Sequence, residues 1–402
     1  MDLDAARPPA EPRGDDRAAR HPEREELPPR HDAELPASQR DGRSDDIPKN
    51  LHLVASASRC HTCLVDFELL DSALADRGEP AFRGRQVWEW VARGARSYDE
   101  MTNLPAGLRE HLAAHVPLSA LVFDRDAKSS DGTEKALFRT HDGRPIEAVL
   151  MRYRDARRSL CLSSQSGCPL TCTFCATGAM KFGRNLTAAE IVDQALHFRR
   201  KTEVDHAVFM GMGEPLINVD NVLAACERLP DIGISARRTA ISTVGWIPGI
   251  ERMLQDDAPK VRLALSVHAA DEETRTKLMP VNTRYALPEV LQACLAWSRK
   301  RRQAVFVEYL MLEDVNDSEE QAELLADVLQ PTEAFKVNLI PYNPTEAAYA
   351  GSSRHTIASF KAILESRGLR ATTRLTRGRD IDAACGQLAA KAAAPQPDPV
   401  AR

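Results

Sequence analysis

The sequence predicts an α/β protein: an incomplete parallel (β/α)6 barrel preceded by a small N-terminal helical domain and a linking β-hairpin. After Arg158, six apolar runs of strand length alternate with helical patterns, which favours a parallel sheet wound with right-handed crossovers. Six such units fit an incomplete barrel better than a closed eight-fold one. In barrels of this kind the functional residues lie at the C-terminal ends of the strands.

Both ends of the chain are expected to be tails. Residues 1–50 are rich in Pro, Arg, Asp, Glu and Ala, so we expect a disordered tail that is either simply solvated or binds a partner weakly. Residues 389–402, rich in Ala and Pro, predict a second loose tail. The first segment holds 9 Lys/Arg and 13 Asp/Glu, a net charge of −4, which leaves −1 of the total −5 for the rest. A nearly neutral body can attract nucleic acid only through local basic patches.

The composition excludes a membrane protein. The 402 residues are 43% apolar, as is ordinary for a soluble protein, and contain no run of about 18 apolar residues and no apolar signal segment. We therefore expect a cytoplasmic protein without structural disulfides. Cys60 and Cys63 have C-x2-C spacing, but no second pair follows nearby, so this pair is interpreted as incidental.

Residues 64–118 are expected to form the small helical domain. Val87, Trp88 and Val91 make an apolar stripe with helical period, and a second short amphipathic pattern runs from Leu104 to Leu112. The arginines that fall largely on the opposite face of the first stripe are either solvated or contact phosphates; they are Arg85, Arg93 and Arg96.

Residues 119–152 change to a strand pattern around the turn His141-Asp-Gly143, which predicts the linking hairpin. The barrel is expected over residues 153–388. Its six strand-like runs are Ser159 to Ser163, Ala207 to Met210, Thr239 to Val244, Val261 to Val267, Ala304 to Met311 and Phe335 to Ile340. The helical patterns between them include residues 187–200, where Thr187 and Glu190 predict a capping box.

Three cysteines on one loop, Cys168, Cys172 and Cys175, follow the first barrel strand with C-x3-C-x2-C spacing. Three close thiolates can hold three corners of a 4Fe-4S cube and leave the fourth iron open for chemistry, whereas clusters that only transfer electrons usually have four cysteines. A structural zinc site with Cys161 as the fourth ligand is the alternative, and incidental free thiols are a third reading.

Polar residues follow the other predicted strands. Gly211 to Pro215 is a Gly-rich turn that lets a ligand approach the backbone, and Glu214 can accept a hydrogen bond from an amine or a ribose hydroxyl, although a plain turn is an equally good reading. Further polar residues at strand ends could be simple caps, but together they favour a small polar ligand on one rim; they are Ser242, Thr243, Ser266, His268 and the segment from Asn338 to Asn343.

Four more cysteines lie outside the loop. Cys226 and Cys294 fall on helical patterns and are predicted to be buried packing residues, as an isolated apolar-flanked cysteine usually is. Cys161, on the first strand, is likewise predicted to be a buried packing residue. Cys385 differs, because it lies between Asp382 and Gly386-Gln387 in a loop-like stretch after the barrel.

The cysteine loop resembles that of radical S-adenosylmethionine enzymes, and the surrounding sequence resembles the 23S ribosomal RNA adenine-C2 methyltransferases. The resemblance covers about residues 64–388. The matching motifs are Phe82-Arg-Gly-Arg-Gln-Val-Trp, Glu100-Met-Thr-Asn-Leu-Pro, Ser130-Asp-Gly-Thr-Glu-Lys, Ser163-Ser-Gln-Ser-Gly-Cys-Pro-Leu-Thr-Cys-Thr-Phe-Cys-Ala-Thr-Gly, Gly211-Met-Gly-Glu-Pro-Leu, Asn338-Leu-Ile-Pro-Tyr-Asn and Asp380-Ile-Asp-Ala-Ala-Cys-Gly-Gln-Leu.

The resemblance implies one 4Fe-4S cluster and two S-adenosylmethionine molecules per turnover. Cys385 would carry a methyl group from the first molecule, and the second would yield the radical that takes hydrogen from that methyl before it joins the base. Glu147 would accept the proton of carbon 2, and Cys161 would free the product by forming a transient disulfide with Cys385. The implied contacts of S-adenosylmethionine are Gly213, Glu214, Ser242, Ser266, Val267, His268 and Asn343.

The resemblance further implies 23S ribosomal RNA as substrate, at adenine 2503 of the peptidyl-transferase centre, and an electron donor such as flavodoxin or ferredoxin. Nothing in the sequence suggests more than a monomer. The small helical domain would dock the RNA. Whether adenine 37 of transfer RNA is a second substrate stays open. Two rivals also stay open: methylation of carbon 8, as in a related resistance family, and a non-catalytic iron-sulfur or zinc protein that binds RNA.

Overall fold

The computed structural model describes residues 67–390. The expected first tail, the Cys60–Cys63 pair and residues 391–402 lie outside this range. The N-terminal helices are α1 (Phe67–Ala75), α2 (Phe82–Arg93), the 3₁₀ turn η1 (Tyr98–Glu100) and α3 (Ala106–His115). The apolar stripe Val87, Trp88 and Val91 is buried as predicted, while Arg85 and Arg93 are exposed. The indole Nε1 of Trp88 donates to a carboxylate oxygen of Asp231 on α5 at 2.7 Å, which joins these helices to the barrel.

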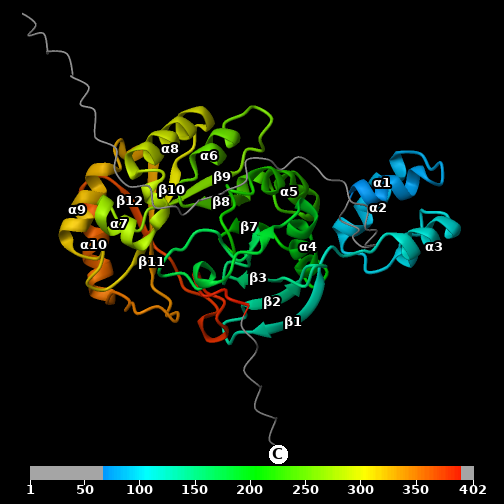
Figure 1. Cartoon of the computed structure of the whole chain (residues 1–402), viewed down its shortest axis with the longest axis horizontal. Helices are drawn as coiled ribbons and strands as arrows, with labels where there is room; N and C mark the ends of the chain where they lie inside the picture. Colours follow the sequence, from blue (N-terminus) through cyan, green and yellow to red (C-terminus); the bar gives the residue numbers. More distant parts are fainter. Residues whose placement is uncertain (1–66, 391–402) are drawn as a thin grey trace, which may run out of the picture. The chain divides into compact units, whose positions relative to one another are not determined.

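Ten strands form one sheet in the order β1-β2-β3-β4-β7-β8-β9-β10-β11-β12 (Figure 1). The last seven are parallel to one another: β4 (Arg158–Cys161), β7 (His206–Phe209), β8 (Thr239–Thr243), β9 (Arg262–Ser266), β10 (Val305–Met311), β11 (Phe335–Pro341) and β12 (Arg370–Thr373). The first six of these coincide with the six predicted runs to within two residues. The incomplete α/β barrel is therefore confirmed, with a seventh strand that was not predicted.

Helices connect and cover the parallel strands (Figure 1). They are α4 (Ala188–Arg199), α5 (Val219–Ile232), α6 (Ile247–Met253), α7 (Glu272–Leu278), α8 (Leu287–Arg301), α9 (Glu319–Val328) and α10 (Arg354–Ser366), with short 3₁₀ turns η2 (Thr177–Ala179), η3 (Ala236–Arg238), η4 (Pro280–Thr283), η5 (Thr332–Ala334) and η6 (Arg379–Ile381). The predicted capping box begins α4: the Thr187 hydroxyl accepts from the Glu190 N–H at 3.2 Å, and the Glu190 carboxylate accepts from the Thr187 N–H at 2.9 Å.

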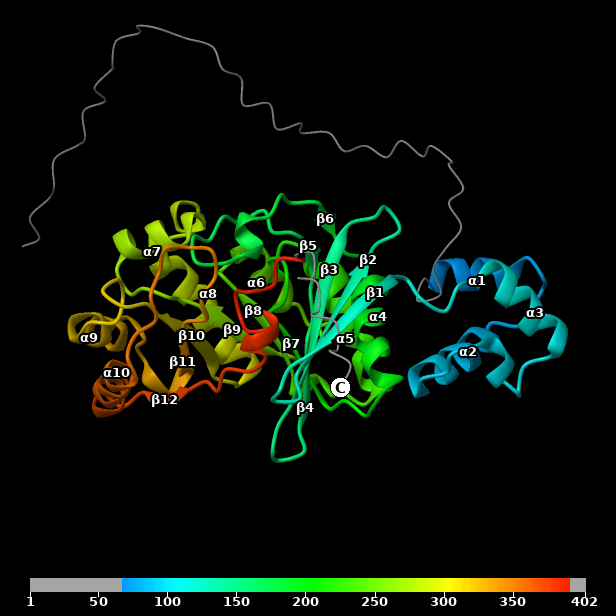
Figure 2. The same cartoon turned by 90° about the horizontal axis from the view of Figure 1, so that it is seen from below.

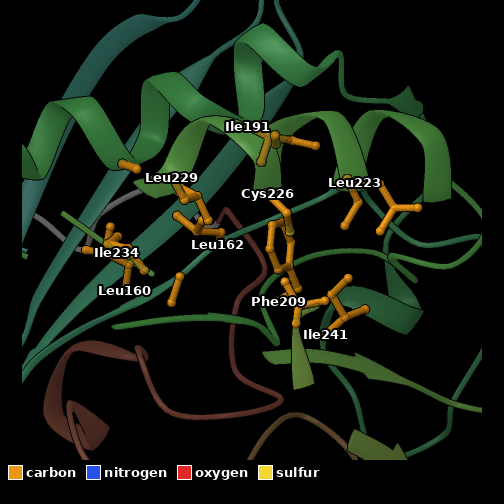
Figure 3. Packing of buried hydrophobic residues seen from close by; sticks show 14 of the residues in the cluster. Leu160, Leu162, Ile191, Phe209, Leu223, Cys226, Leu229, Ile234 and Ile241 are labelled. Carbon is orange, nitrogen blue, oxygen red and sulfur yellow. The ribbon is translucent and has the colours of Figure 1, made fainter. Parts of the chain in front are cut away.

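The core lies between the sheet and the helices. Figure 3 shows its part beneath α4 and α5, where Leu160 and Phe209 from the strands meet Ile191, Leu223 and Leu229 from the helices. Cys226 is 1% exposed and Cys294 is fully buried, both within this apolar cluster. Their prediction as packing residues is confirmed.

The predicted hairpin exists, but it is not a separate linker. β2 (Glu134–Arg139) and β3 (Pro145–Arg152) pair antiparallel around the turn, and β1 (Val122–Lys128) adds a third strand. β3 also pairs antiparallel with β4, so the barrel sheet continues directly into these strands (Figure 2). The physical reason is that β4 would otherwise present an unpaired edge.

The segment after β12 returns across the molecule to β1–β3 and to the cysteine loop (Figures 1 and 2). The Asp380 carboxylate accepts from the Ser130 N–H at 3.0 Å, and Lys135 Nζ donates to the Asp382 carbonyl at 3.1 Å. Residues 389 and 390, which were expected to begin the loose tail, are instead held in place, because their N–H groups donate to the buried Glu147 carboxylate. Over residues 67–390, no helix is long and apolar enough to cross a membrane.

Candidate active site

The three loop cysteines line one cavity at the C-terminal ends of the parallel strands, together with Cys385. We call it the main cavity; the other residues that line it and matter below are Gly213, Glu214, Ser242, Ser266, His268, Glu308 and Arg374. A smaller side cavity adjoins it, lined by Met151, Cys161, Met210, Asn343, Arg374, Arg377, Cys385 and several apolar side chains. Cys385, Met210 and Arg374 face both cavities.

Backbone contacts fix the loop that carries the cysteines. A two-residue ladder of β5 (Gln165–Ser166) with β6 (Arg184–Asn185) closes its base. Gly167 has φ +72° there, and a Cβ on it would lie 2.5 Å from the Lys181 carbonyl oxygen, so only glycine fits. At the tip, the Thr173 N–H donates to the Leu278 carbonyl at 3.0 Å. The Ala176 N–H donates to the Gly386 carbonyl at 2.8 Å, which ties the loop to the segment that carries Cys385.

The donor chemistry of the loop fits an iron-sulfur cluster. Burial raises the pKa of Cys168 to about 12 and raises the pKa values of Cys172 and Cys175, and neighbouring thiols of the loop add to the shifts of Cys168 and Cys172. Thiols crowded in this way are stable as thiolates when a cation holds them. Over residues 67–390, no three His, Cys, Asp or Glu side chains are placed to hold one metal ion together. Three loop thiolates can hold three corners of a 4Fe-4S cube, whereas a structural zinc needs a fourth protein ligand.

Gly213 and Glu214 follow β7 at the wall of the main cavity. Gly213 has φ +97°, and a Cβ there would lie 2.5 Å from the Gln165 Cβ, so glycine is required. The Glu214 carboxylate is 3% exposed and accepts from the N–H groups of Leu216 and Val244, each at 3.0 Å. Burial raises its pKa to about 7. A carboxylate has about four acceptor positions, so it keeps capacity for a ligand amine or hydroxyl.

The polar residues after β8 and β9 are also at the main cavity. Ser242, Ser266 and His268 line it, whereas the buried Val267 donates its N–H to the Glu308 carbonyl at 3.1 Å. His268 Nδ1 accepts from the Leu310 N–H at 3.0 Å, so the neutral ring carries its proton on Nε2. Burial lowers the pKa of His268 to about 3, which keeps the ring neutral at physiological pH.

Cys161 and Cys385 meet at the side cavity, and both are free thiols. Cys161 lies on β4 and is 7% exposed, which agrees with its prediction as a buried packing residue. Asn343 lies at the side cavity rather than the main one, and its Nδ2 donates to the Cys385 carbonyl at 3.2 Å. Gly386 has φ +84°, so the turn just after Cys385 also requires glycine.

The structure does not bring Glu147 to either cavity. This residue is 2% exposed on β3, and its carboxylate forms an ion pair with Lys135 Nζ at 2.9 Å and accepts from the Ala389 and Ala390 N–H groups. It lies two residues before Val149, the register partner of Cys161, and therefore on the same face of β3 as Val149.

Three site residues were missed from the sequence. Arg275 is fully buried beside the loop, its Nη2 donating to the Val244 carbonyl at 2.8 Å, and its charge acts against the rise in the pKa of Cys172. Arg374 follows β12, and Glu308 lies in β10; both face the main cavity. Only Glu308 left a signal, since it interrupts an apolar strand run with a charge.

Two family models match the chain. Residues 162–326 match the radical SAM superfamily, and residues 64–118 match the N-terminal domain of ribosomal RNA large subunit methyltransferases. A protein named probable dual-specificity RNA methyltransferase RlmN, from Thermus thermophilus, is 44% identical over 338 residues, covering 82% of this chain and 94% of that protein. A protein of the same name from Salinispora tropica is 44% identical over 347 residues, covering 81% and 92%.

A solved structure is similar throughout its length. The crystal structure of a radical SAM methyltransferase from Sphaerobacter thermophilus superposes with a TM-score of 0.77 at 41% sequence identity. The match covers 82% of this chain and all of that one.

Proposed function

Because this chain belongs to the RlmN family of radical SAM RNA methyltransferases, we propose that it methylates carbon 2 of an adenine in 23S ribosomal RNA, adenine 2503, with the methyl group carried on Cys385. Carbon 2 of adenine lies between two ring nitrogens and is electron-poor, so it does not attack the methyl of a sulfonium as a nucleophile. A radical route is therefore required. The single observation that carries the proposal is that Cys385 lines the same cavity as the three loop cysteines.

Residues of the main cavity and its neighbourhood would hold the cofactors. Cys168, Cys172 and Cys175 would hold a 4Fe-4S cluster. The side chains and backbone that would hold S-adenosylmethionine are Gly213, Glu214, Ser242, Ser266, Val267, His268 and Asn343. When bound, the cluster and S-adenosylmethionine supply a carbon radical that abstracts a hydrogen atom. Two S-adenosylmethionine molecules are used per turnover, one as methyl donor and one as radical source.

The chain's own residues perform the remaining steps. The Cys385 sulfur takes the methyl group, and Asn343 holds the Cys385 backbone at the junction of the two cavities. Once the methylene radical has added to carbon 2, the adduct must lose one electron, which the cluster would take back, and one proton, which Glu147 accepts. Its contacts with Lys135, Ala389 and Ala390 must part for this. Cys161 then attacks Cys385, and a transient disulfide releases the product.

The substrate is RNA, and helices α1 to α3 dock it. Support comes from the exposed Arg85 and Arg93, which lie on α2 away from its buried stripe and suit phosphate contacts. The adenine is flipped into the main cavity, where unstacked bases of single-stranded RNA are read. We also propose adenine 37 of transfer RNA as a second substrate, a flavodoxin or ferredoxin as electron donor, and a monomeric enzyme.

The test is mass spectrometry of nucleosides from protein-free 23S RNA after anaerobic incubation with reconstituted enzyme, reductant and deuteromethyl S-adenosylmethionine. We expect labelled 2-methyladenosine that has lost one deuterium, because the methyl gives up a hydrogen atom before transfer. Cys385→Ala should abolish the label and is the control. Labelled 8-methyladenosine would show that the enzyme methylates carbon 8 instead of carbon 2. Full activity of Cys385→Ala would show that Cys385 does not carry the methyl group.

A further inference from the structure

Arg374 is a partly buried cation at the junction of the two cavities. It follows β12, the strand that the sequence did not reveal, and it lines the main cavity with Cys385 and the side cavity with Cys161 and Cys385. Its side chain is 22% exposed. Nothing in the steps above uses this residue, although a guanidinium this far inside a protein needs partners of opposite charge.

A chain of contacts from three strands fixes the guanidinium. Arg374 Nη1 lies 2.9 Å from the Met210 sulfur and 3.6 Å from the Glu308 carboxylate. Asn338 Nδ2 donates to the other oxygen of Glu308 at 2.9 Å, and the Thr372 hydroxyl donates to Asn338 Oδ1 at 2.6 Å. These contacts hold Arg374 in place without a close bidentate carboxylate, so its charge stays available to the cavities.

Cys161 needs such a cation. Its attack on Cys385 requires a thiolate, but burial raises the pKa of Cys161 to about 12, and the nearby Cys385 adds to this rise. Arg374 is the charge that acts in the opposite direction, and it interacts with Cys385 more strongly than with Cys161. Once the Cys385 sulfur is bonded to carbon it carries no charge, which leaves Cys161 as the thiol at the side cavity that Arg374 can hold as a thiolate. The other arginine at the side cavity, Arg377, is turned to Asp131, donating to its carbonyl at 3.3 Å and lying 3.9 Å from its carboxylate.

We propose that Arg374 is a positioning residue for product release, stabilising Cys161 as the thiolate that attacks Cys385. This inference rests on the proposed function. In the step, the Cys161 thiolate forms an S–S bond with the Cys385 sulfur as the bond from that sulfur to the methylene carbon on the base breaks. The electron pair of the broken bond leaves on the methylene carbon, which is conjugated with the ring and takes a proton to become methyl. The two sulfurs are oxidised by two electrons, and the carbon is reduced by two.

The experiment follows the covalent protein–RNA adduct by denaturing gel and mass spectrometry, using full-length reconstituted enzyme. Cys161→Ala should accumulate the adduct, because it lacks the attacking sulfur. Arg374→Gln should also accumulate it, with decay at least about ten-fold slower than in the unaltered enzyme, as expected when the thiolate fraction falls by one pKa unit. Arg374→Lys restores a cation and should restore decay. Arg370→Gln, exposed on the same strand β12 and outside both cavities, is the matched control and should behave like the unaltered enzyme.

Three other results would overturn the proposed role of Arg374 or the proposed function. Arg374→Gln that methylates Cys385 but shows no adduct, or that leaves Cys385 unmethylated in peptide mass spectra, overturns the assignment to product release. Arg374→Lys that behaves like Arg374→Gln overturns the role of charge. If Cys161→Ala gives no adduct, the proposed function itself fails, which separates its failure from that of Arg374.

Discussion

The half-buried His197 is one residue whose surroundings make the stability of this protein depend on pH. Its ring lies among the aromatic rings of Phe123, Phe138 and Phe198, with centroid distances of 4.8, 5.0 and 5.1 Å. Burial lowers its pKa to about 4, and Lys201 and Arg200 add to that shift while Asp126 and Glu134 oppose it. The neutral ring is thus the form that folding selects.

Acidification should therefore cost stability through His197. Because its pKa is lower in the folded state than the ordinary 6.5, the unfolded chain binds more protons between pH 6.5 and about 4, and stability is lost as the pH falls through this window. For a partly exposed ring we expect a loss of about 1 kcal/mol between about pH 7 and about pH 5. Urea unfolding of His197→Leu should show that much less dependence on pH. His355→Leu, at an exposed position, should keep the full dependence, and equal slopes for both variants would contradict the prediction.

Helix α4 depends on its N-terminal cap, Thr187, as well as on its buried apolar face. It follows directly on the β5–β6 ladder that closes the cysteine loop, so its first turn helps to set where that loop ends. Thr187→Ala removes the hydroxyl that accepts from the Glu190 N–H. We expect a loss of about 1 kcal/mol in the free energy of urea unfolding, since an unpaired N–H at a helix start costs this much. Thr187→Ser keeps the hydroxyl cap and should lose little stability. If Thr187→Ala leaves the free energy of unfolding unchanged, the prediction is wrong, and the contact of Arg184 with the Glu190 carboxylate is enough to hold the first turn of α4.

The strands also show which parts of the fold and the site could be predicted from the sequence. Six strands were visible because buried parallel strands read as apolar runs. β12 was not, because Arg370-Ala-Thr-Thr buries only Ala371 at the edge of the sheet. The three loop cysteines could be found from spacing alone, whereas Arg374 follows the unseen strand. The contact of Glu147 with Lys135 comes from cross-strand pairing, and a single sequence does not encode it visibly.

On the scale of the whole molecule, the described helices of the N-terminal domain belong to the same compact unit as the barrel. If they dock RNA, Arg93→Gln should weaken binding of a 23S RNA fragment about equally for all sequences. It should also reduce the slope of log affinity against log salt by about 1, as the loss of one phosphate contact does. Filter binding between about 50 and about 200 mM salt measures both. Arg299→Gln, exposed on α8, is the matched control, and equal slopes for the two variants would remove Arg93 from the RNA surface.

The order of strands in the sheet has a consequence for how the protein is made. Each strand pairs with the one synthesised just before it in the sheet, from β1 to β12, so the sheet can grow along one edge as the chain leaves the ribosome. Residues 374–390 are then translated after all ten strands, and they reach back to Ser130, Lys135 and Glu147 near its beginning. The scaffold can therefore assemble strand by strand, and Cys385, the residue proposed to carry the methyl group, is translated only after all ten strands of the sheet.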